Sequence, residues 1–337
     1  MQIAGDAGTG GRDIPKPTPN RAVKRTPPAP ALAAAVVRQQ RLRPPRLLTY
    51  FDAVARHGSI RKAADALNVA SSALNRQILD LEADLGSALF ERLPRGVRLT
   101  AAGEVFIAYA RQALSDLRTV ESQVEQLRGL VRGRVSVAAV ESVAGELLPS
   151  AITEFQAAHP HVRFNVRIGA PQELLAVLVA DQVDLILTHY PPPKKDATIV
   201  ATAGQALCAL MVTDHPLARR ADLRLRDCLA FPLALGDATL AGRALIEQVL
   251  AQASFELDPR LVSNSVETMK AFARMNRGVC FQFRRPGKTV VAPGDMIAVP
   301  LSDVALLQAK LYLATRRGRV LPVAAAAFVE LFERIFA

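Results

Sequence analysis

The chain has 337 residues, half of them apolar, which allows two or three domains with substantial cores. The formal net charge is +11, and the local balances are +6 over residues 1–45, +3 over 46–134 and +2 over 135–337. Positive charge concentrated towards the N-terminus is typical of a part that approaches nucleic-acid phosphates. No apolar run approaches the roughly 20 residues of a membrane span, and no compact hydrophobic leader begins the chain. We therefore expect a cytoplasmic protein with no membrane partner.

Residues 1–45 hold eight prolines among glycine, alanine and basic residues, without periodicity and with almost nothing to bury. This composition predicts a disordered, basic, proline-rich tail that adds non-specific attraction to DNA. The alternative is that the start codon is misassigned and the tail is not made.

From Arg46 the composition changes, and apolar residues at Leu47, Phe51 and Val54 predict a helix that His57-Gly58 ends. Two shorter helices then follow within residues 59–85. The first buries alanines and Leu67, and the second has a stripe with spacings of four, three and four, formed by Leu74, Ile78, Leu81 and Leu85.

The connection between these two short helices is predicted at Asn68-Val69, because asparagine tolerates a positive φ. Ser59 is the expected N-cap of the first helix, and Ser71 or Ser72 that of the second. The exposed face of the second helix then carries Ser71, Ser72, Asn75, Arg76 and Leu79. Hydroxyl, amide and guanidinium groups on one face suit base edges and phosphates in a major groove. An ordinary helical hairpin in a core is the alternative for this stretch alone.

Two short strands, Leu89–Arg92 and Val97–Leu99, are predicted around the turn Pro94-Arg95-Gly96. A basic β-hairpin beside a helix-turn-helix is a wing. Its arginines are expected along the phosphate backbone, where they give affinity without sequence information. The predicted DNA-binding residues are Ser59, Arg61, Ser71, Ser72, Asn75, Arg76, Arg92, Arg95 and Arg98.

Thr100 is expected to cap a long helix whose apolar residues follow a strict heptad, and the helix should end near residues 129–133. So narrow a stripe favours pairing with a second copy of the helix, and packing on its own domain is the alternative. The heptad positions are Phe106, Ala110, Ala113, Leu117, Val120, Val124, Leu127 and Val131.

From residue 134 strand-like and helix-like segments alternate, which predicts a bilobal α/β domain with a largely parallel sheet. The predicted strands are 135–140, 162–168, 183–188, 206–213, 260–262, 279–283 and 306–315. The predicted helices are 147–158, 172–180, 240–253, 266–275 and 323–336. The three cysteines, Cys208, Cys228 and Cys280, are widely spaced without a CxxC pair, which favours buried reduced thiols over a redox switch.

With these elements in place, the sequence resembles the LysR-type transcriptional regulators. The matching stretch is LLTYFDAVARHGSIRKAADALNVASSALNRQILDLEADLGSALFERLPRGVRLTAAGEVF. It carries the family's phenylalanine helix and the GS, AA, N-V, LE, LG, LF.R, LT and AG elements at their spacings. Weaker likeness continues through LLPSAITEFQAAHPHVRFNV, DQVDLILTH, DHPLAR and RLVSNSVETMKAFARMNRGVCF, so the resemblance covers residues 46–337.

The resemblance implies an N-terminal all-α winged helix-turn-helix with a long linker helix, followed by a bilobal α/β periplasmic-binding-protein-like effector domain. The expected limits are 1–45 for the tail, 46–103 for the DNA-binding domain, 104–133 for the linker helix and 134–337 for the effector domain. Within the last, lobe I is expected at about 134–204 and 303–337, and lobe II at about 205–302. The resemblance also implies a homodimer or homotetramer that binds an inverted-repeat operator in double-stranded DNA. RNA polymerase is a further partner implied by the family.

In family members a small-molecule effector lies between the lobes. The positions that match are Ser142, Ala170, Gln172, Thr188, His189, Ser265 and Thr268. Hydroxyl groups beside helix N-termini suit anions, so an acidic effector is expected, although Ala170 stands where members often have a hydroxyl. The alternative is that Ser142 and Ser265 act only as helix caps and that His189 is a surface histidine.

The sequence departs from the family pattern in the recognition helix, where Ser71 replaces a usual glutamine and Asn75 a usual serine. Asn276 replaces the first of two usual glycines and is expected to adopt the left-handed conformation. Gln282 stands near a usual Leu-Pro, at the rim of the cleft. The operator and the effector are therefore not predicted from the family.

Three other functions compete with this interpretation. A solute-binding protein shares the bilobal architecture but would carry a signal peptide and neither a wing nor a heptad helix. An enzyme is disfavoured because GxGxxG, P-loop, HExxH and G-x-S-x-G motifs are absent and the five histidines are scattered. We expect no catalytic residues, metal site or cofactor. A DNA-binding regulator whose cleft has lost its ligand response remains the third alternative.

Overall fold

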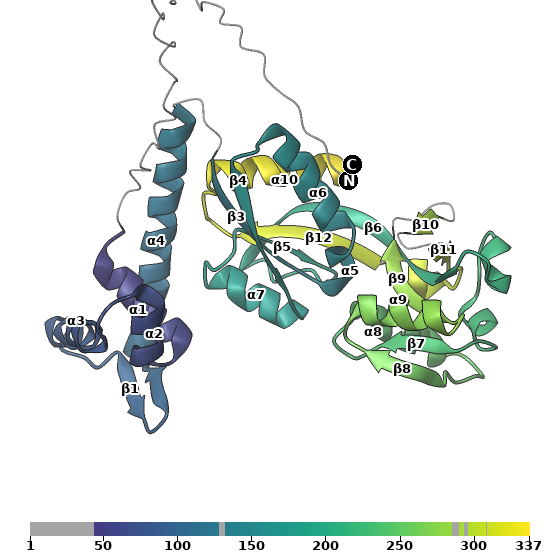
Figure 1. The fold of residues 1–337 in the computed structure, drawn as a ribbon, viewed down its shortest axis with the longest axis horizontal. Coiled ribbons are helices and arrows are strands. Elements are labelled where there is room, and N and C mark those ends of the chain that lie inside the picture. The colour runs from purple at the N-terminus through teal and green to yellow at the C-terminus, as the bar shows by residue number, and fades with distance from the viewer. Residues whose placement is uncertain (1–43, 128–131, 285–289, 293–295, 308) are drawn as a thin grey trace, which may run out of the picture. The chain divides into compact units, whose positions relative to one another are not determined.

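The computed structural model describes residues 44–127, 132–284, 290–292, 296–307 and 309–337 (Figure 1). The predicted disordered tail falls outside these residues, apart from its last two. The described chain forms a helical domain with a β-hairpin, a long helix and a two-lobed α/β domain. Within these ranges no helix is long and apolar enough to cross a membrane.

The helical domain contains the three predicted helices, α1 (Arg46–His57), α2 (Ile60–Leu67) and α3 (Ser71–Asp84). Their apolar stripes meet in one core, which includes Phe51, Val54, Ala63, Ala64, Leu74, Ile78 and Leu81. Leu85 does not join this core as predicted, because α3 ends at Asp84 and the Leu85 side chain is 50% exposed.

The turn between α2 and α3 confirms the expectation for Asn68, which has φ of +52°. The Ser59 side chain caps α2 by accepting a hydrogen bond from the Lys62 backbone N–H at 3.4 Å. The predicted serine cap of α3 is wrong. Ala70 occupies the N-cap without a side-chain bond, so Ser71 and Ser72 form the first turn of the helix.

The wing consists of antiparallel strands β1 (Phe90–Leu93) and β2 (Gly96–Leu99). Glu82 fixes its start, because one carboxylate oxygen accepts hydrogen bonds from the backbone N–H groups of Leu89 and Phe90 at 2.7 and 2.9 Å. Gly96 has φ of +137°, and a Cβ at this position would lie 2.2 Å from the Gly58 carbonyl oxygen. Only glycine therefore lets the wing approach the loop between α1 and α2.

The long helix α4 (Ala101–Leu127) begins at the predicted cap, where the Thr100 hydroxyl accepts a hydrogen bond from the Gly103 N–H at 3.0 Å. A Cβ on Gly103 would lie 2.0 Å from the Leu89 carbonyl oxygen, so the helix can pass the wing only with glycine there. At the other end of α4 the last heptad position, Val131, lies outside the described residues.

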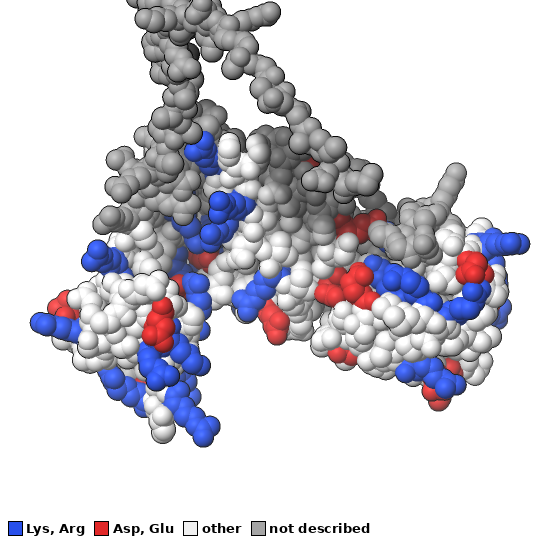
Figure 2. Space-filling model, viewed as in Figure 1, with Lys and Arg blue, Asp and Glu red and all other residues white. Residues whose placement is uncertain are grey.

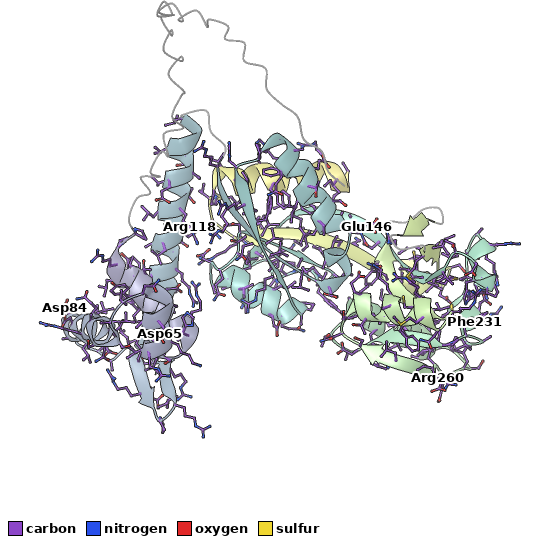
Figure 3. All side chains as sticks on the ribbon, in the orientation of Figure 1. Asp65, Asp84, Arg118, Glu146, Phe231 and Arg260 are labelled. Atoms are coloured by element: carbon purple, nitrogen blue, oxygen red, sulfur yellow. The ribbon has the colours of Figure 1, made fainter. Side chains whose placement is uncertain are left out.

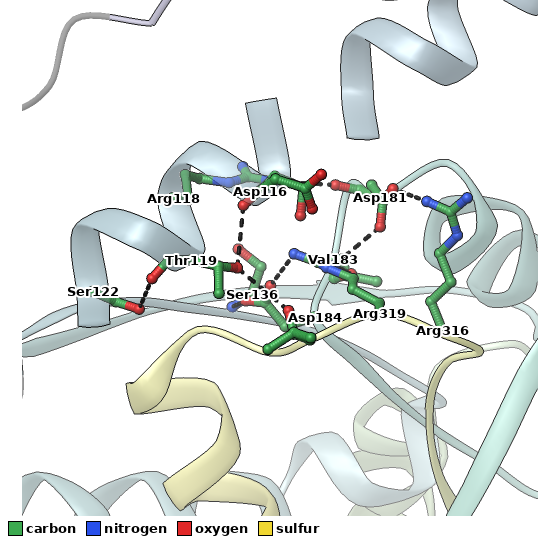
Figure 4. Close-up of polar contacts among 12 residues, drawn as sticks. Asp116, Arg118, Thr119, Ser122, Ser136, Asp181, Val183, Asp184, Arg316 and Arg319 are labelled. Atoms are coloured by element: carbon green, nitrogen blue, oxygen red, sulfur yellow. Dashed lines mark hydrogen bonds and ion pairs between the residues drawn. The ribbon is translucent and has the colours of Figure 1, made fainter. Parts of the chain in front are cut away.

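Helix α4 has two different faces. A polar face, whose Thr119 and Ser122 are labelled in Figure 4, contacts lobe I. The Thr119 hydroxyl donates to the Val320 carbonyl at 3.3 Å, and the Ser122 hydroxyl accepts from the Val323 N–H at 3.1 Å. The heptad positions Val120, Val124 and Leu127 are 48%, 43% and 88% exposed. Packing on its own effector domain thus uses the polar face and leaves much of the heptad stripe free.

The α/β domain follows the predicted alternation of strands and helices. Lobe I contains β3 (Gly133–Ala139), α5 (Glu141–Ala144), α6 (Leu147–Ala158), β4 (Val162–Ile168), α7 (Pro171–Val179), β5 (Leu185–Thr188), β12 (Ala309–Arg316) and α10 (Val323–Phe336). Lobe II contains β7 (Leu233–Gly236), α8 (Ala241–Leu250), β8 (Pro259–Ser263), α9 (Val266–Met275), β9 (Val279–Arg284), β10 (Val290–Ala292), β11 (Met296–Pro300) and three short 3₁₀ turns, Pro216–Arg219, Leu225–Cys228 and Val304–Leu307.

The two lobes share strand β6 (Ala197–Val212), which begins nine residues before the predicted strand. Its first half pairs with β12, and from Ala206 it pairs with β9 and then β11. The sheet order is β4-β3-β5-β12-β6-β9-β7-β8, with parallel pairs inside each lobe and antiparallel pairs around β6 and β12. The sheet is therefore mixed and not largely parallel as predicted.

The return of the chain to lobe I occurs later than the predicted boundary near residue 303. Residues 304–307 form a 3₁₀ turn, not the start of a strand, and Leu306 lies in the lobe II core with Phe281 and Ile246. The chain re-enters lobe I only with β12, whose Leu311 and Leu313 join the lobe I core.

A buried ionic cluster closes lobe I where it faces α4 (Figure 4). The Asp181 carboxylate pairs with Arg316 and, at 3.3 Å, with Arg319. Arg319 also pairs with Asp184 at 2.9 Å, and Asp184 accepts from the Ser136 N–H at 2.8 Å. The side chains of Asp181 and Arg319 have almost no solvent exposure, so each buried charge is stabilised by the opposite charge of its partner and not by water.

Candidate functional site

Helix α3 presents the side chains predicted to meet DNA. Its buried residues Leu74 and Ile78 hold it against α1 and α2, which turns the opposite face outwards. Ser72 and Arg76 are exposed on that face, and Ser71 and Asn75 are partly exposed. Figure 2 shows lysine and arginine side chains gathered around this part of the chain.

The three wing arginines have different environments. Arg98 forms two hydrogen bonds with Glu91 across the wing strands, at 2.6 and 3.2 Å, so its charge is already compensated. Arg92 donates to the Asn75 side chain at 2.9 Å. Among the residues that the structure describes, Arg95 at the exposed tip has no hydrogen-bond or ion-pair partner, which leaves its guanidinium available to a phosphate.

Two remaining predicted residues lie on α2. Arg61 is exposed in its first turn, whereas the Ser59 hydroxyl is engaged as the helix cap. Gln77, which is not among the predicted DNA-binding residues, is an exposed amide beside Arg76 on α3.

A cavity of about 490 Å³ lies in the cleft between the lobes. Four of the seven predicted effector residues line it, and they are Ser142, Ala170, His189 and Ser265. The other three do not. The Gln172 side chain is exposed elsewhere, the buried Thr188 hydroxyl accepts a hydrogen bond from the Tyr190 N–H, and the Thr268 backbone N–H donates to Ser265, which caps α9.

Ser142 and His189 form a hydrogen-bonded pair in this cavity. The His189 Nδ1 lies 3.1 Å from the Lys310 carbonyl oxygen, and Nε2 lies 2.8 Å from the Ser142 hydroxyl. A carbonyl only accepts, so Nδ1 carries the proton, and Nε2 of the neutral ring accepts the proton of Ser142. Burial lowers the pKa of His189 to about 4, which keeps the ring neutral. Packing of the ring against Phe283, 4.2 Å away, contributes to this burial.

Several contacts hold the two lobes together beside the cavity. The Gln282 Nε2 of β9 donates to the Ser142 carbonyl oxygen at 3.1 Å. Arg284 of lobe II pairs with Glu146 of lobe I at 2.5 Å; Glu146 is labelled in Figure 3. The Ser265 hydroxyl also donates to the Glu141 carboxylate at 3.4 Å. Any ligand that changes the separation of the lobes must change these contacts.

Six polar residues line the cavity that were not among the predicted effector residues: Glu141, Glu173, Thr239, Arg243, Asn264 and Gln282. Glu141 and Gln282 had detectable signals, because one adjoins a predicted site residue and the other departs from the family pattern. Glu173 likewise adjoins a predicted site residue, Gln172. Arg243 had no such signal, since it lies inside an amphipathic helix whose exposed face is polar in any case.

The cysteines do not form a reactive centre. Cys208, Cys228 and Cys280 are all buried and unbonded, and burial raises their pKa values to about 11, 12 and 12. Thiols held in the protonated form are poor nucleophiles, which favours the buried-thiol interpretation over the redox switch. The described ranges contain no group of histidine, cysteine and acidic residues that could hold a metal ion.

Comparison with known proteins assigns both parts of the chain. Residues 45–104 match the bacterial regulatory helix-turn-helix family of lysR type, and residues 128–337 match the LysR substrate binding domain. A RuBisCO operon transcriptional regulator from Allochromatium vinosum is 27% identical over 285 residues, which cover 85% of this chain and 94% of that protein. An SDS degradation transcriptional activation protein from a Pseudomonas species is 34% identical over 193 residues, 56% of this chain and 63% of that protein.

Solved structures share the fold along nearly the whole described chain. Full-length OxyR from Pseudomonas aeruginosa, a variant protein, superposes with a TM-score of 0.61 at 22% identity, covering 85% of this chain and 96% of that one. Full-length CbnR in complex with its target DNA gives a TM-score of 0.56 at 24% identity, covering 86% and 98%. With both family models matched and the winged helix, linker helix and bilobal domain in the same order, this chain is a DNA-binding transcriptional regulator of the LysR family.

Proposed function

We propose that the protein acts in the cytoplasm as a homodimer or homotetramer that binds an interrupted inverted repeat and changes its DNA complex when a small molecule occupies the cleft. Two copies of α3 then read successive major grooves, and Arg95 at the tip of each wing contacts a flanking phosphate. Altered placement of the DNA-binding domains changes promoter bending and the access of RNA polymerase.

The observation that carries this proposal is the exposed heptad face of α4. Val120, Val124 and Leu127 form an apolar strip directly beyond the domain that bears the recognition helix. Such a strip is stabilised when a second copy covers it, because apolar surface leaves water. Pairing the linker helices also supplies the second DNA reader that an inverted repeat requires.

The ligand response is supported by the position of the cavity among contacts that join the lobes. Ser142 lines the cavity and its carbonyl accepts from Gln282 of the other lobe, so an occupant of the cavity touches the joint itself. A ligand can shift the arrangement of the lobes only by its differential affinity for two arrangements. Direct contact with joint residues provides that difference.

The test is selection of duplex sites from a random pool by the full-length protein, together with sedimentation of the free protein. We expect an enriched motif of two inverted half-sites. Their centres should be separated by one or more helical turns of DNA, each of roughly 10 base pairs. We also expect a sedimenting species of two or four chains. A single half-site bound by a monomer would contradict the proposal.

A further inference from the structure

The two walls of the cleft cavity differ in chemistry. Lobe I contributes polar groups, among them Glu141, Ser142, Glu173 and His189. Lobe II contributes most of the large apolar side chains, among them Leu240, Phe281 and Phe283, together with the polar residues Thr239, Arg243, Asn264, Ser265 and Gln282. A ligand that fits both walls therefore has a polar head and an apolar body.

The side chains of the lobe I wall accept hydrogen bonds and offer few donors. The Ser142 hydroxyl gives its proton to His189, whose own proton is held by the Lys310 carbonyl. Ser142 can then only accept from a ligand, through its remaining lone pair. The ring of His189 has no further hydrogen-bonding capacity. The pair thus presents one acceptor to the cavity and no donor.

Gln282 adds an acceptor without a partner. Its side chain lines the cavity and is 4% exposed, and its Nε2 is used by the Ser142 carbonyl. The Oε1 atom of the same amide is buried without a hydrogen bond among the described residues. A buried acceptor left unsatisfied is unfavourable, and a donor on a bound ligand would satisfy it.

Carboxylates outnumber the cations along the cavity. Glu141 and Glu173 both line it, whereas Arg243 is the cation among the lining residues and already pairs with Glu247 at 2.7 Å. The nearby Lys270, which does not line the cavity, pairs with Glu267 at 2.7 Å. Arg243 and Lys270 thus each have an acidic partner, while the carboxylates of Glu141 and Glu173 have no basic partner among the described residues.

We infer that the effector of this regulator is an amphipathic amine, with a protonated amino group at Glu141, Ser142 and Glu173 and an apolar body against Phe281 and Phe283. An ammonium group carries three donors and no acceptor, which matches a wall of two carboxylates and a hydroxyl acceptor. The sequence alone predicted an acidic effector, and the carboxylates on this wall favour the opposite charge. This inference rests on the proposed ligand response and gives its ligand a class.

The test uses three probes with the same apolar body on the full-length protein. Phenethylamine carries the ammonium, phenethyl alcohol is its neutral counterpart and phenylacetate its anionic one. Isothermal titration should give an affinity for the amine about tenfold above that for the alcohol, and phenylacetate should bind more weakly than both. Phenylacetate binding as tightly as the amine, or the absence of amine binding, would overturn the inference.

Charge-removing variants locate the amino group. Glu141→Gln and Glu173→Gln should each lower the affinity for phenethylamine roughly fivefold and leave that for the alcohol unchanged. Glu173 is exposed, so its substitution does not threaten the fold, and Glu154→Gln on the exposed face of α6 is the matched control. Equal losses for amine and alcohol would count against the assigned contacts.

Binding to the selected duplex, measured in the same preparations, separates this inference from the proposed function. Specific DNA binding that phenylacetate modulates and phenethylamine does not would keep the ligand-controlled regulator and remove the amine. If the unmodified protein showed no specific DNA binding, that result would instead contradict the proposed function.

Discussion

Arg92 of the wing donates a hydrogen bond from Nη2 to the Oδ1 of Asn75 on the recognition helix, over 2.9 Å. A guanidinium has donors only, so the bonded atom of the amide must be its oxygen. The Asn75 NH₂ group is thereby left as a donor, and we propose that it faces the major groove. Donors of this kind read the acceptor atoms of purines and of thymine in the major groove.

Asn75→Asp should therefore reduce sequence discrimination while preserving the contact with Arg92. The carboxylate still accepts from Arg92 but offers no donor to a base, so the preference for the selected site over a scrambled one should fall by about 1–3 kcal/mol. Fluorescence anisotropy with both duplexes measures this preference. Asn165→Asp, the same change at an exposed position of β4, is the control. An unchanged preference would remove Asn75 from base reading.

Arg95→Ala should weaken binding to every duplex by a similar factor. Its free guanidinium at the wing tip is suited to a phosphate, and one lost phosphate contact reduces the slope of log affinity against log salt by about 1. Titrations at several salt concentrations give this slope. Arg260→Ala on β8, where the arginine is likewise exposed (Figure 3), should leave the slope unchanged. A change confined to one sequence would argue against a backbone contact.

Val124→Glu should separate the oligomer into monomers. The substitution places a charge in the centre of the exposed heptad strip, where burial against a second helix would leave it unpaired. Sedimentation velocity measures the result. Gln123→Glu adds the same charge one residue away and off the heptad, and it should retain the oligomer. If both variants remain associated, the oligomer is held elsewhere.

Asp181→Asn should destabilise lobe I by about 3 kcal/mol or more, because it leaves the buried Arg319 with a single acidic partner and Arg316 with none in this cluster. In urea unfolding followed by circular dichroism, the variant should have its transition midpoint at a lower urea concentration than the unmodified protein. The same substitution at the exposed Asp258 is the control and should have little effect. Equal midpoints for the two variants would show that the cluster contributes little net stability.

His189 predicts a stability loss in mild acid. Its pKa falls from the ordinary 6.5 to about 4 in the folded protein, so below pH 6.5 the unfolded chain takes up a proton that the folded chain rejects. The contribution is complete above pH 6.5 and declines as the pH falls towards 4, by on the order of 2 kcal/mol between pH 7 and pH 5. Unfolding of His189→Gln over the same range should be less dependent on pH. Parallel pH profiles for both proteins would contradict this assignment.

Local patterns in the sequence were sufficient for most helices and for the turn at Asn68. The bounds of α10, Val323–Phe336, coincide with its amphipathic repeat, and Leu74, Ile78 and Leu81 are buried as their spacing predicts. The position of the left-handed residue near residue 276 was not predicted correctly. Asn276 was expected to adopt it, but Asn276 has φ of −103° and Arg277 has φ of +46°. The Arg277 side chain bonds Asp214, 63 residues earlier, and such a contact leaves no local pattern.

By itself the sequence determined the type of domain, the order of the domains and the outward face of the recognition helix, because these depend on periodicity and on motifs within about 60 residues. Only the tertiary structure decided the mixed direction of the sheet, the partner of Asn75 and the charge of the cavity wall. Glu141 and Glu173 are 32 positions apart, and strand pairing within lobe I brings both to the cavity. Side chains that meet through folding carry no shared period along the chain, so their joint chemistry is visible only once the chain is folded.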